Sequence, residues 1–149
     1  MGIGTKRAAC PPVGAAIAGH PMAMSPVLIG RTLSLTDLED VALRGRPVRF
    51  DDEARAKAAK SRAAVERIAA AGDAAPRVYG VNTGFGALSE TRISAQDIRA
   101  LQRNLVRSHA TGVGPDLPVP EVRGLMLLRA QVLALGHSGV RPEIVDLLV

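Results

Sequence analysis

Small and apolar residues recur at helical spacing in the middle of the chain, on a stretch without glycine or proline. They follow one another at steps of four and three: Ala54, Ala58, Ser61, Val65 and Ile68. This spacing puts them on one narrow face of an α-helix. Asp51 or Asp52 can cap the start of the helix, which is predicted to run to Ala71 because Gly72 follows.

Cap and breaker residues predict helices on either side of this one. The segment 36–39 has the form of a capping box, in which the Thr36 hydroxyl and the Glu39 carboxylate satisfy free amides, and Gly45 ends that helix. After the long helix, Ser94 with Asp97 three residues later predicts another helix start. The apolar face of that helix is expected to hold the following residues: Ile98, Leu101, Leu105 and Ser108.

Proline marks two helices expected near the end of the chain. Pro120 suits the first turn of a helix, where a backbone N–H has no partner to lose. Glycines at 136–139 interrupt the apolar pattern, and Pro142 starts a last helix that is predicted to continue through Leu148. Because its apolar face is unfinished at Val149, we expect a domain truncated at its C-terminus, with exposed apolar faces on the last two helices.

Three short pieces are predicted to be extended, at residues 27–29, 47–50 and 77–81. The fold class expected is therefore mainly α, with short β pieces. Residues 1–25 contain proline and glycine without periodicity and are expected to form a flexible tail, so the folded part should cover residues 26–149.

The composition narrows the classes of function. Aromatic residues make up 2% of the chain, so any core is expected to be built from Ala, Val, Leu and Ile. The formal charge is +5, but the basic residues are interleaved with acidic ones rather than with aromatics, which argues against nucleic-acid binding. No apolar run is long enough to span a bilayer. Cys10 is the only cysteine, which excludes an intrachain disulfide and fits a cytoplasmic protein.

The only tyrosine of the chain lies in a glycine-rich stretch. Tyr79 and Phe85 are set among Gly80, Gly84 and Gly86. Glycine adopts positive φ at little cost, so such a run forms tight turns or a loop that moves. A phenol on a mobile loop can transfer a proton once the loop closes over a substrate. The alternative is a structural role, in which a half-buried phenol anchors a turn.

This glycine-rich stretch and three later segments resemble the family of histidine and aromatic amino acid ammonia-lyases. The segments follow the family's order at plausible separations: Tyr79–Gly86, Leu101–His109, Thr111–Gly114 and Gly136–Pro142. A loop with Gly-x-Gly is a weak signal alone, whereas linked segments of this length are specific. The resemblance implies the N-terminal, loop-bearing part of a largely helical fold whose complete enzyme is a homotetramer.

The resemblance also implies a reaction, the removal of ammonia from an α-amino acid to leave an unsaturated acid. In the family, an Ala-Ser-Gly tripeptide cyclises to an electrophilic methylidene-imidazolone group, and the tyrosine that matches Tyr79 is the catalytic acid/base. A phenol has a pKa of about 10 in water, so it needs positive charge or hydrogen-bond donors nearby to act as a base near neutrality.

The same resemblance implies three substrate-binding residues: His109, Asn82 and Gly86. Ser108-His109 is similar to the histidine-specific branch, where the histidine faces the ring of the substrate. Because imidazole can exchange hydrogen bonds with imidazole or phenol, tyrosine also remains open as a substrate. His109 could instead be a helix C-terminal residue favourable to the dipole, or a metal ligand, but no second His or Cys lies at metal spacing, so no metal is expected. Asn82 and Gly86 could contact the substrate or hold the loop closed.

The sequence departs from the family in one respect that bears on activity. Ala-Ser-Gly occurs nowhere in the 149 residues. We therefore expect the N-terminal segment of an enzyme that converts L-histidine to urocanate in histidine catabolism, and we expect this chain to be inactive alone. The alternatives are a non-catalytic remnant, a docking fragment, or a segment of a phenylalanine or tyrosine ammonia-lyase or aminomutase.

Overall fold

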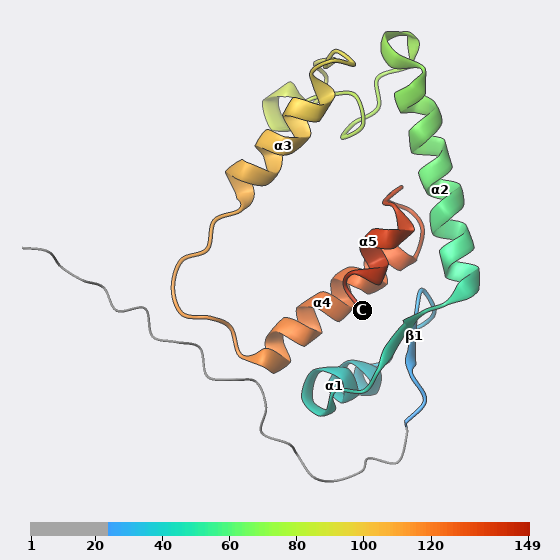
Figure 1. The fold of residues 1–149 in the computed structure, drawn as a ribbon, viewed down its shortest axis with the longest axis vertical. Helices are drawn as coiled ribbons and strands as arrows, with labels where there is room; N and C mark the ends of the chain where they lie inside the picture. The colour runs from blue at the N-terminus through green and yellow to red at the C-terminus, as the bar shows by residue number, and fades with distance from the viewer. Residues whose placement is uncertain (1–23) are drawn as a thin grey trace, which may run out of the picture.

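The computed structural model describes residues 24–149, which form five α-helices and two short strands (Figure 1). The elements are β1 Val27–Ile29, α1 Leu35–Arg44, β2 Val48–Phe50, α2 Asp52–Ala70, α3 Ile98–His109, α4 Val119–Ala134 and α5 Pro142–Asp146, with 3-10 turns η1 Gly72–Ala74 and η2 Gly86–Leu88. The prediction of a mainly helical fold with short β pieces is confirmed. The tail expected at residues 1–25 lies outside the described residues, apart from Met24 and Ser25.

The two strands form a small parallel sheet, with α1 as the crossover between them. Val27 pairs with Val48, and Ile29 pairs with Phe50. Val27, Ile29 and Phe50 are buried, because alternate residues of a strand point to the same face and this face meets the helices. The sequence predicted the two extended pieces but contained no signal for their pairing.

One apolar core joins both ends of the described chain. Its buried members come from both strands and from α1, α2, α4 and α5: Val27, Ile29, Val41, Phe50, Ala54, Ala58, Leu127, Ala130, Ala134 and Val145. Alanines are the buried residues of α2 and two of the three buried residues of α4, and small side chains allow helices to approach closely. The core contains the aliphatic residues expected from the composition, with Phe50 in addition.

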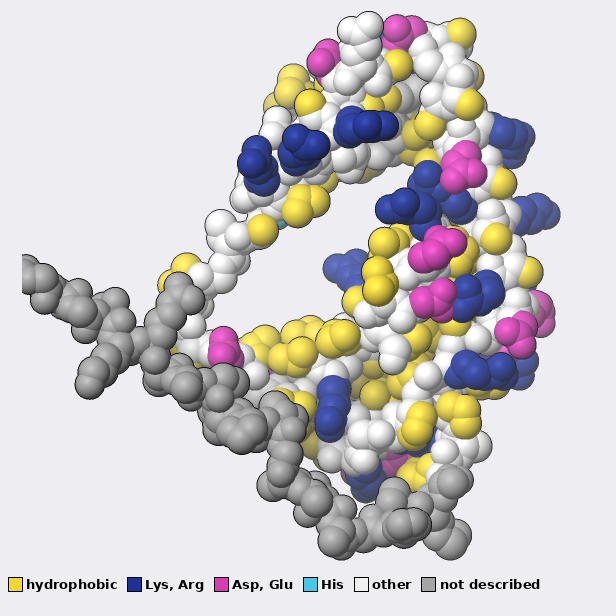
Figure 2. All heavy atoms as spheres, in the orientation of Figure 1, with side chains coloured by type: hydrophobic (Ala, Val, Ile, Leu, Met, Phe, Trp, Pro, Cys, Tyr) yellow, Lys and Arg dark blue, Asp and Glu magenta, His cyan; other side chains and the backbone are white. Residues whose placement is uncertain are grey.

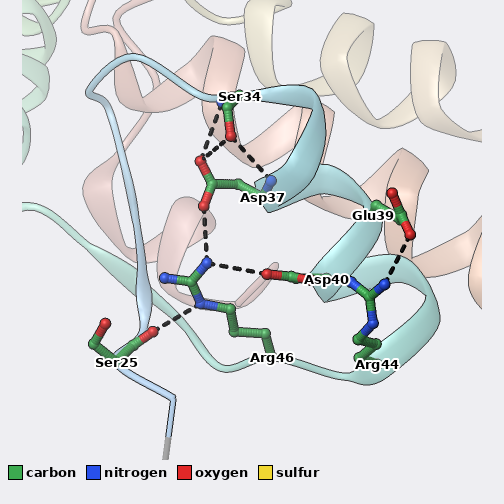
Figure 3. A network of polar contacts seen from close by, with 7 residues as sticks. All are labelled: Ser25, Ser34, Asp37, Glu39, Asp40, Arg44 and Arg46. Carbon is green, nitrogen blue, oxygen red and sulfur yellow. Dashed lines mark hydrogen bonds and ion pairs between the residues drawn. The ribbon is translucent and has the colours of Figure 1, made fainter.

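The start of α1 is capped by Ser34 rather than by Thr36 (Figure 3). The Ser34 hydroxyl accepts from the Asp37 amide at 3.1 Å, and the Asp37 carboxylate accepts from the Ser34 amide at 3.1 Å. The predicted box over residues 36–39 is therefore wrong by two residues. Hydrogen bonds from the Ser34 side chain and then its backbone, together with Arg46, hold the pKa of Asp37 below its ordinary value.

Arg46 ties the segment before β1 to α1 (Figure 3). Its Nη1 lies 2.9 Å from the Asp37 carboxylate and 3.3 Å from that of Asp40, which is buried and also pairs with Arg44. Its Nε donates to the Ser25 carbonyl at 2.8 Å. Arg46 thus shares the buried carboxylate of Asp40 with Arg44 and also holds the segment that leads into β1.

The long helix α2 begins where the sequence predicted. Its cap is Asp51, which is buried and accepts from the Ala54 amide at 3.1 Å. Arg31 pairs with the same carboxylate at 2.6 Å. The Ala54 hydrogen bond and then Arg31 lower the pKa of Asp51. The helix ends at Ala70, before Gly72, one residue short of the prediction.

Gln131 on α4 fastens this helix to the end of β1. Its Oε1 accepts from the Gly30 amide at 2.9 Å and its Nε2 donates to the Arg31 carbonyl at 2.6 Å. Pro120 lies in the first turn of α4, as predicted. Apolar side chains line the side of α4 that faces the opening toward α3 (Figure 2), and the exposed residues of this helix include Leu125 and Val132.

The last helix is shorter than predicted. It ends at Asp146, and a turn follows in which the Leu148 amide donates to the Val145 carbonyl. Asp146 pairs with Arg55 of α2, which anchors this short helix to the longest one. None of the helices between residues 24 and 149 has the length and apolar character needed to cross a membrane.

Candidate functional site

The candidate site is the tyrosine loop, defined here as residues 75–93 between α2 and α3. In Figure 1 this loop lies at the end of α2 that is distant from the small sheet. Residues 77–81 were predicted to be extended, but they form a turn in which the amides of Val81 and Asn82 both donate to the Val78 carbonyl, at 3.1 and 3.2 Å. The prediction was wrong because the β-branched residues here have no partner strand, while Asn82 offers the backbone a local alternative.

Asn82 braces the loop from inside. Its side chain is buried, with the residue only 3% exposed. The Oδ1 atom accepts from the Val78 amide at 2.7 Å, and Nδ2 donates to the Pro76 carbonyl at 2.9 Å. These two contacts lie just before Tyr79, and the Asn82 backbone follows just after it. Both halves of the amide are therefore committed to holding the turn that carries Tyr79.

Backbone pairing closes the loop behind this brace. The Gly84 amide donates to the Thr91 carbonyl at 3.0 Å, and the Ile93 amide donates to the Asn82 carbonyl at 3.0 Å. Thr83, which is buried, and Arg92 form an antiparallel bridge between these two bonds. The loop is thus a cross-linked turn rather than an open connection.

Two arginines tie the segments that enter and leave the loop to each other. Arg77 donates to the Glu90 carbonyl at 3.0 Å, and Arg92 donates through Nη2 to the Ala75 carbonyl. The Nη1 atom of Arg92 is buried without a partner among the described residues. Neither arginine was predicted as part of the site, because no local sequence pattern pairs a side chain with a carbonyl that is 13 or 17 residues away.

Tyr79 points out of this braced turn. Its side chain is 65% exposed, and its ring meets that of Phe85 edge to face, with centroids 5.9 Å apart and planes at 79°. This arrangement is a favourable one for aromatic pairs. The phenol is therefore held by Phe85 and by the turn, and it remains accessible to a molecule that approaches from outside.

Gly86 and Gly84 shape the part of the loop that follows Phe85. Gly86 opens η2 with φ of +55°, a conformation that side-chain-bearing residues rarely adopt. A Cβ at Gly84 would lie 2.6 Å from the Leu88 Cβ and 2.8 Å from the Leu88 carbonyl oxygen. Both glycines are explained by backbone geometry.

His109 is the last residue of α3 and is exposed. Its Nδ1 lies 2.9 Å from the Leu105 carbonyl oxygen and 3.0 Å from the Ser108 hydroxyl, which itself donates to Leu105. Because a carbonyl only accepts, the contact with Leu105 places a hydrogen on Nδ1. In the neutral tautomer with this hydrogen, Nε2 is the acceptor of the ring.

The structure gathers Tyr79, Asn82 and Gly86 on one loop, whereas His109 lies at the far end of the next helix. Within residues 24–149, no hydrogen bond or ring contact joins Tyr79 to His109. A hollow of about 290 Å³ lies elsewhere, between α4, the end of α1 and β2, and is lined by residues that include Val41, Arg46 and Leu127. In the described part of the chain, no three His, Cys, Asp or Glu side chains form a group that could hold a metal ion.

Comparison with known proteins identifies the family. The family model for aromatic amino acid lyases matches residues 33–149, so the chain belongs to the aromatic amino acid lyase family. The resemblance inferred from the tyrosine loop and the segments after it is confirmed.

Individual relatives agree with this assignment. Over 122 residues the chain is 70% identical to histidine ammonia-lyase of Sorangium cellulosum, which covers 82% of this chain and 24% of that protein. The fold matches tyrosine aminomutase from Streptomyces globisporus with a TM-score of 0.74 at 39% identity, over 83% of this chain and 23% of that one. The fold also matches histidine ammonia-lyase from Trypanosoma cruzi with a TM-score of 0.69 at 35% identity, over 83% of this chain and 23% of that one. The chain therefore spans about a quarter of the length of these relatives.

Proposed function

We propose that residues 26–149 are the N-terminal portion of an ammonia-lyase domain that eliminates ammonia from L-histidine to give urocanate, a step of histidine catabolism. The observation that carries the proposal is the exposed phenol of Tyr79 on a loop whose buried polar groups are engaged in bracing it. The 70% identity to a histidine ammonia-lyase supports the choice of reaction.

In this proposal Tyr79 moves the proton. Elimination breaks the C–H bond at the β carbon and the C–N bond at the α carbon, and the electron pair left at the β carbon forms the new double bond. The phenolate oxygen of Tyr79 takes the β proton, and the α-ammonium group leaves as ammonia with the electron pair of the C–N bond. The edge-to-face contact with Phe85 orients the ring for this transfer.

His109 recognises the substrate ring. Its Nδ1–H is engaged by Leu105, so Nε2 can accept a hydrogen bond from the N–H of a substrate imidazole. Asn82 and Gly86 contribute through the shape of the loop, since the Asn82 amide is buried and the role of Gly86 is in its backbone conformation.

The electrophile of the family does not fit within these residues. It would supply activation of the β proton, but its Ala-Ser-Gly precursor is not among the 149 residues. We therefore propose that the 149 residues alone do not catalyse the elimination. In the complete enzyme we propose a homotetramer in the cytoplasm, with the electrophile supplied from outside this segment.

Two observations favour alternatives. The exposed apolar side of α4 would suit a non-catalytic remnant or docking fragment that packs on another lyase polypeptide. The fold match to a tyrosine aminomutase at 39% identity leaves room for a tyrosine or phenylalanine substrate, or for an aminomutase.

A grafted lyase tests the proposal. In this protein, residues 26–149 replace the matching segment of the Sorangium cellulosum histidine ammonia-lyase, and urocanate is followed by its ultraviolet absorbance. We expect turnover in the grafted lyase, none from the 149-residue chain alone, and a loss of at least about 10²-fold in kcat for Tyr79→Phe, in line with the contribution of a general base. Full turnover by Tyr79→Phe would refute the role of the phenol.

The substrate assignment has its own variant. His109→Leu in the grafted lyase removes the acceptor at Nε2 and should shift the ratio of kcat/KM values from histidine toward phenylalanine. An unchanged ratio would remove His109 from recognition and favour the alternative substrates.

A further inference from the structure

We propose that Asn82 is a positioning residue for Tyr79, acting through the backbone of the loop and not through contact with the substrate. The inference rests on the proposed function for its catalytic consequence. Its structural part, that Asn82 sets the orientation of the Tyr79 ring, stands independently of the reaction.

Hydrogen bonds from Asn82 surround Tyr79 in the chain. The Asn82 side chain accepts from the Val78 amide at 2.7 Å and donates to the Pro76 carbonyl at 2.9 Å, so it fixes the first and the third residue before Tyr79. The Asn82 backbone amide also donates to the Val78 carbonyl at 3.2 Å. Tyr79 thus sits inside a ring of hydrogen bonds that begins and ends at Asn82.

Asn82 is also linked to the second half of the tyrosine loop. The Asn82 carbonyl accepts from the Ile93 amide at 3.0 Å, and the neighbouring Thr83 bridges Arg92. The Thr83 hydroxyl donates to the Gly84 carbonyl at 3.1 Å. The brace is therefore connected to the segment leading into α3, and a turn fixed at both ends holds the phenol in one direction.

The Asn82 side chain is not available for contact with a substrate. Asn82 is 3% exposed, and one bond to each half of its amide is made with the loop itself. A substrate would have to open the turn to reach this amide. Tyr79, by contrast, is exposed and already accessible.

Two variants remove the brace to different extents. Asn82→Ala loses both bonds. Asn82→Asp keeps an oxygen that can accept from Val78 but sets a second oxygen, which lacks the N–H donor, against the Pro76 carbonyl. Asn104→Asp is the matched control, because Asn104 is exposed on α3 and is the other asparagine of the chain.

The orientation of the ring can be measured without any turnover. Tyr79 is the only tyrosine of the 149 residues, so ¹³C-tyrosine labelling of this chain gives a single set of ring signals in NMR. The contact with Phe85 should shift those signals from random-coil positions. We expect the shift to disappear in Asn82→Ala, to shrink in Asn82→Asp and to persist in Asn104→Asp. A shift that persists in Asn82→Ala would overturn the proposal.

The grafted lyase then gives a second readout, in which kcat is calculated per folded enzyme so that unfolded protein does not lower it. We expect Asn82→Ala to lower kcat by about 10²-fold, the cost of misplacing a reacting group by about 1 Å, while KM for histidine changes less than about threefold. Asn82→Asp should fall between Asn82→Ala and the parent protein. An unchanged kcat, or a raised KM with unchanged kcat, would overturn the proposal. Full activity of Tyr79→Phe would instead sink the proposed function, and the NMR result would still decide the structural part.

Discussion

Replacing Gly84 by alanine should open the tyrosine loop. The new Cβ would lie 2.6 Å from the Leu88 Cβ and 2.8 Å from the Leu88 carbonyl oxygen, about 1 Å inside normal contact. The second atom belongs to the backbone of η2, so a change of side-chain rotamer cannot relieve the overlap. Overpacking of this kind costs about 1–3 kcal/mol, and we expect the upper part of that range.

Alanine substitutions at two other glycines serve as references for the stability cost of Gly84→Ala. Gly86 has φ of +55° and nothing within 4 Å of an added Cβ, so Gly86→Ala should cost only the left-handed strain of about 1–2 kcal/mol. Gly112 has neither a positive φ nor a neighbour within 4 Å, so Gly112→Ala should lie within about 0.5 kcal/mol of the parent. The three variants separate overlap, strain and the substitution itself.

Amide hydrogen exchange measures the effect where it occurs. The amides of Gly84 and Ile93 close the loop, and their protection reports its opening. A cost of about 1–3 kcal/mol raises their exchange rates roughly 5- to 160-fold, because each 1.4 kcal/mol is a factor of ten. We expect the exchange rate to be highest in Gly84→Ala, lower in Gly86→Ala and lowest in Gly112→Ala. The rates are measured by mass spectrometry on a peptide that covers residues 83–93. Exchange in Gly84→Ala that matches Gly112→Ala would refute the close packing of η2 against the loop.

Other predictions concern the scaffold. The folded-state pKa values of Asp37 and Asp51 are lowered. The stability that these carboxylates contribute is therefore present above the ordinary carboxyl pKa and is lost as pH falls through the folded-state pKa values. The midpoint of thermal unfolding should drop on acidification below about pH 4, and the drop should be less steep in Asp37→Asn. Gln131→Leu leaves the Gly30 amide without its partner and should lower the free energy of unfolding by about 1–3 kcal/mol in urea titrations. Gln102→Leu, at an exposed position of α3, is its control. Equal effects of the two substitutions would contradict the role of Gln131 in fastening α4 to the end of β1.

Local signals predicted the helices well. Asp51 caps α2 and Gly45 ends α1 because both act through the backbone next to them, which a sequence pattern describes directly. The cap of α1 was placed at Thr36 because two overlapping segments, 34–37 and 36–39, both have the spacing of a capping box. Arg46 pairs with Asp37 and favours the first of them, and that contact comes from a residue beyond the helix.

The local conformation of the tyrosine loop was not predicted. Tyr79 and His109 were found from motifs, yet the turn around Tyr79 was predicted as extended, since the bonds of the Asn82 side chain have no counterpart in a hydrophobic pattern. Arg77 and Arg92 were missed for a different reason, because each donates to a carbonyl more than ten residues away. Contacts between distant residues are what sequence periodicity cannot encode.

The clamp between Gln131 and Gly30 has a consequence for biosynthesis. These residues are 101 positions apart, so closing this contact costs about 4 kcal/mol of chain entropy before a constant term. A ribosome adding about 5–20 residues per second needs roughly 5–20 s to make the intervening chain. During that interval the apolar faces of β1 and α2 that pack against α4 are left exposed on the nascent polypeptide.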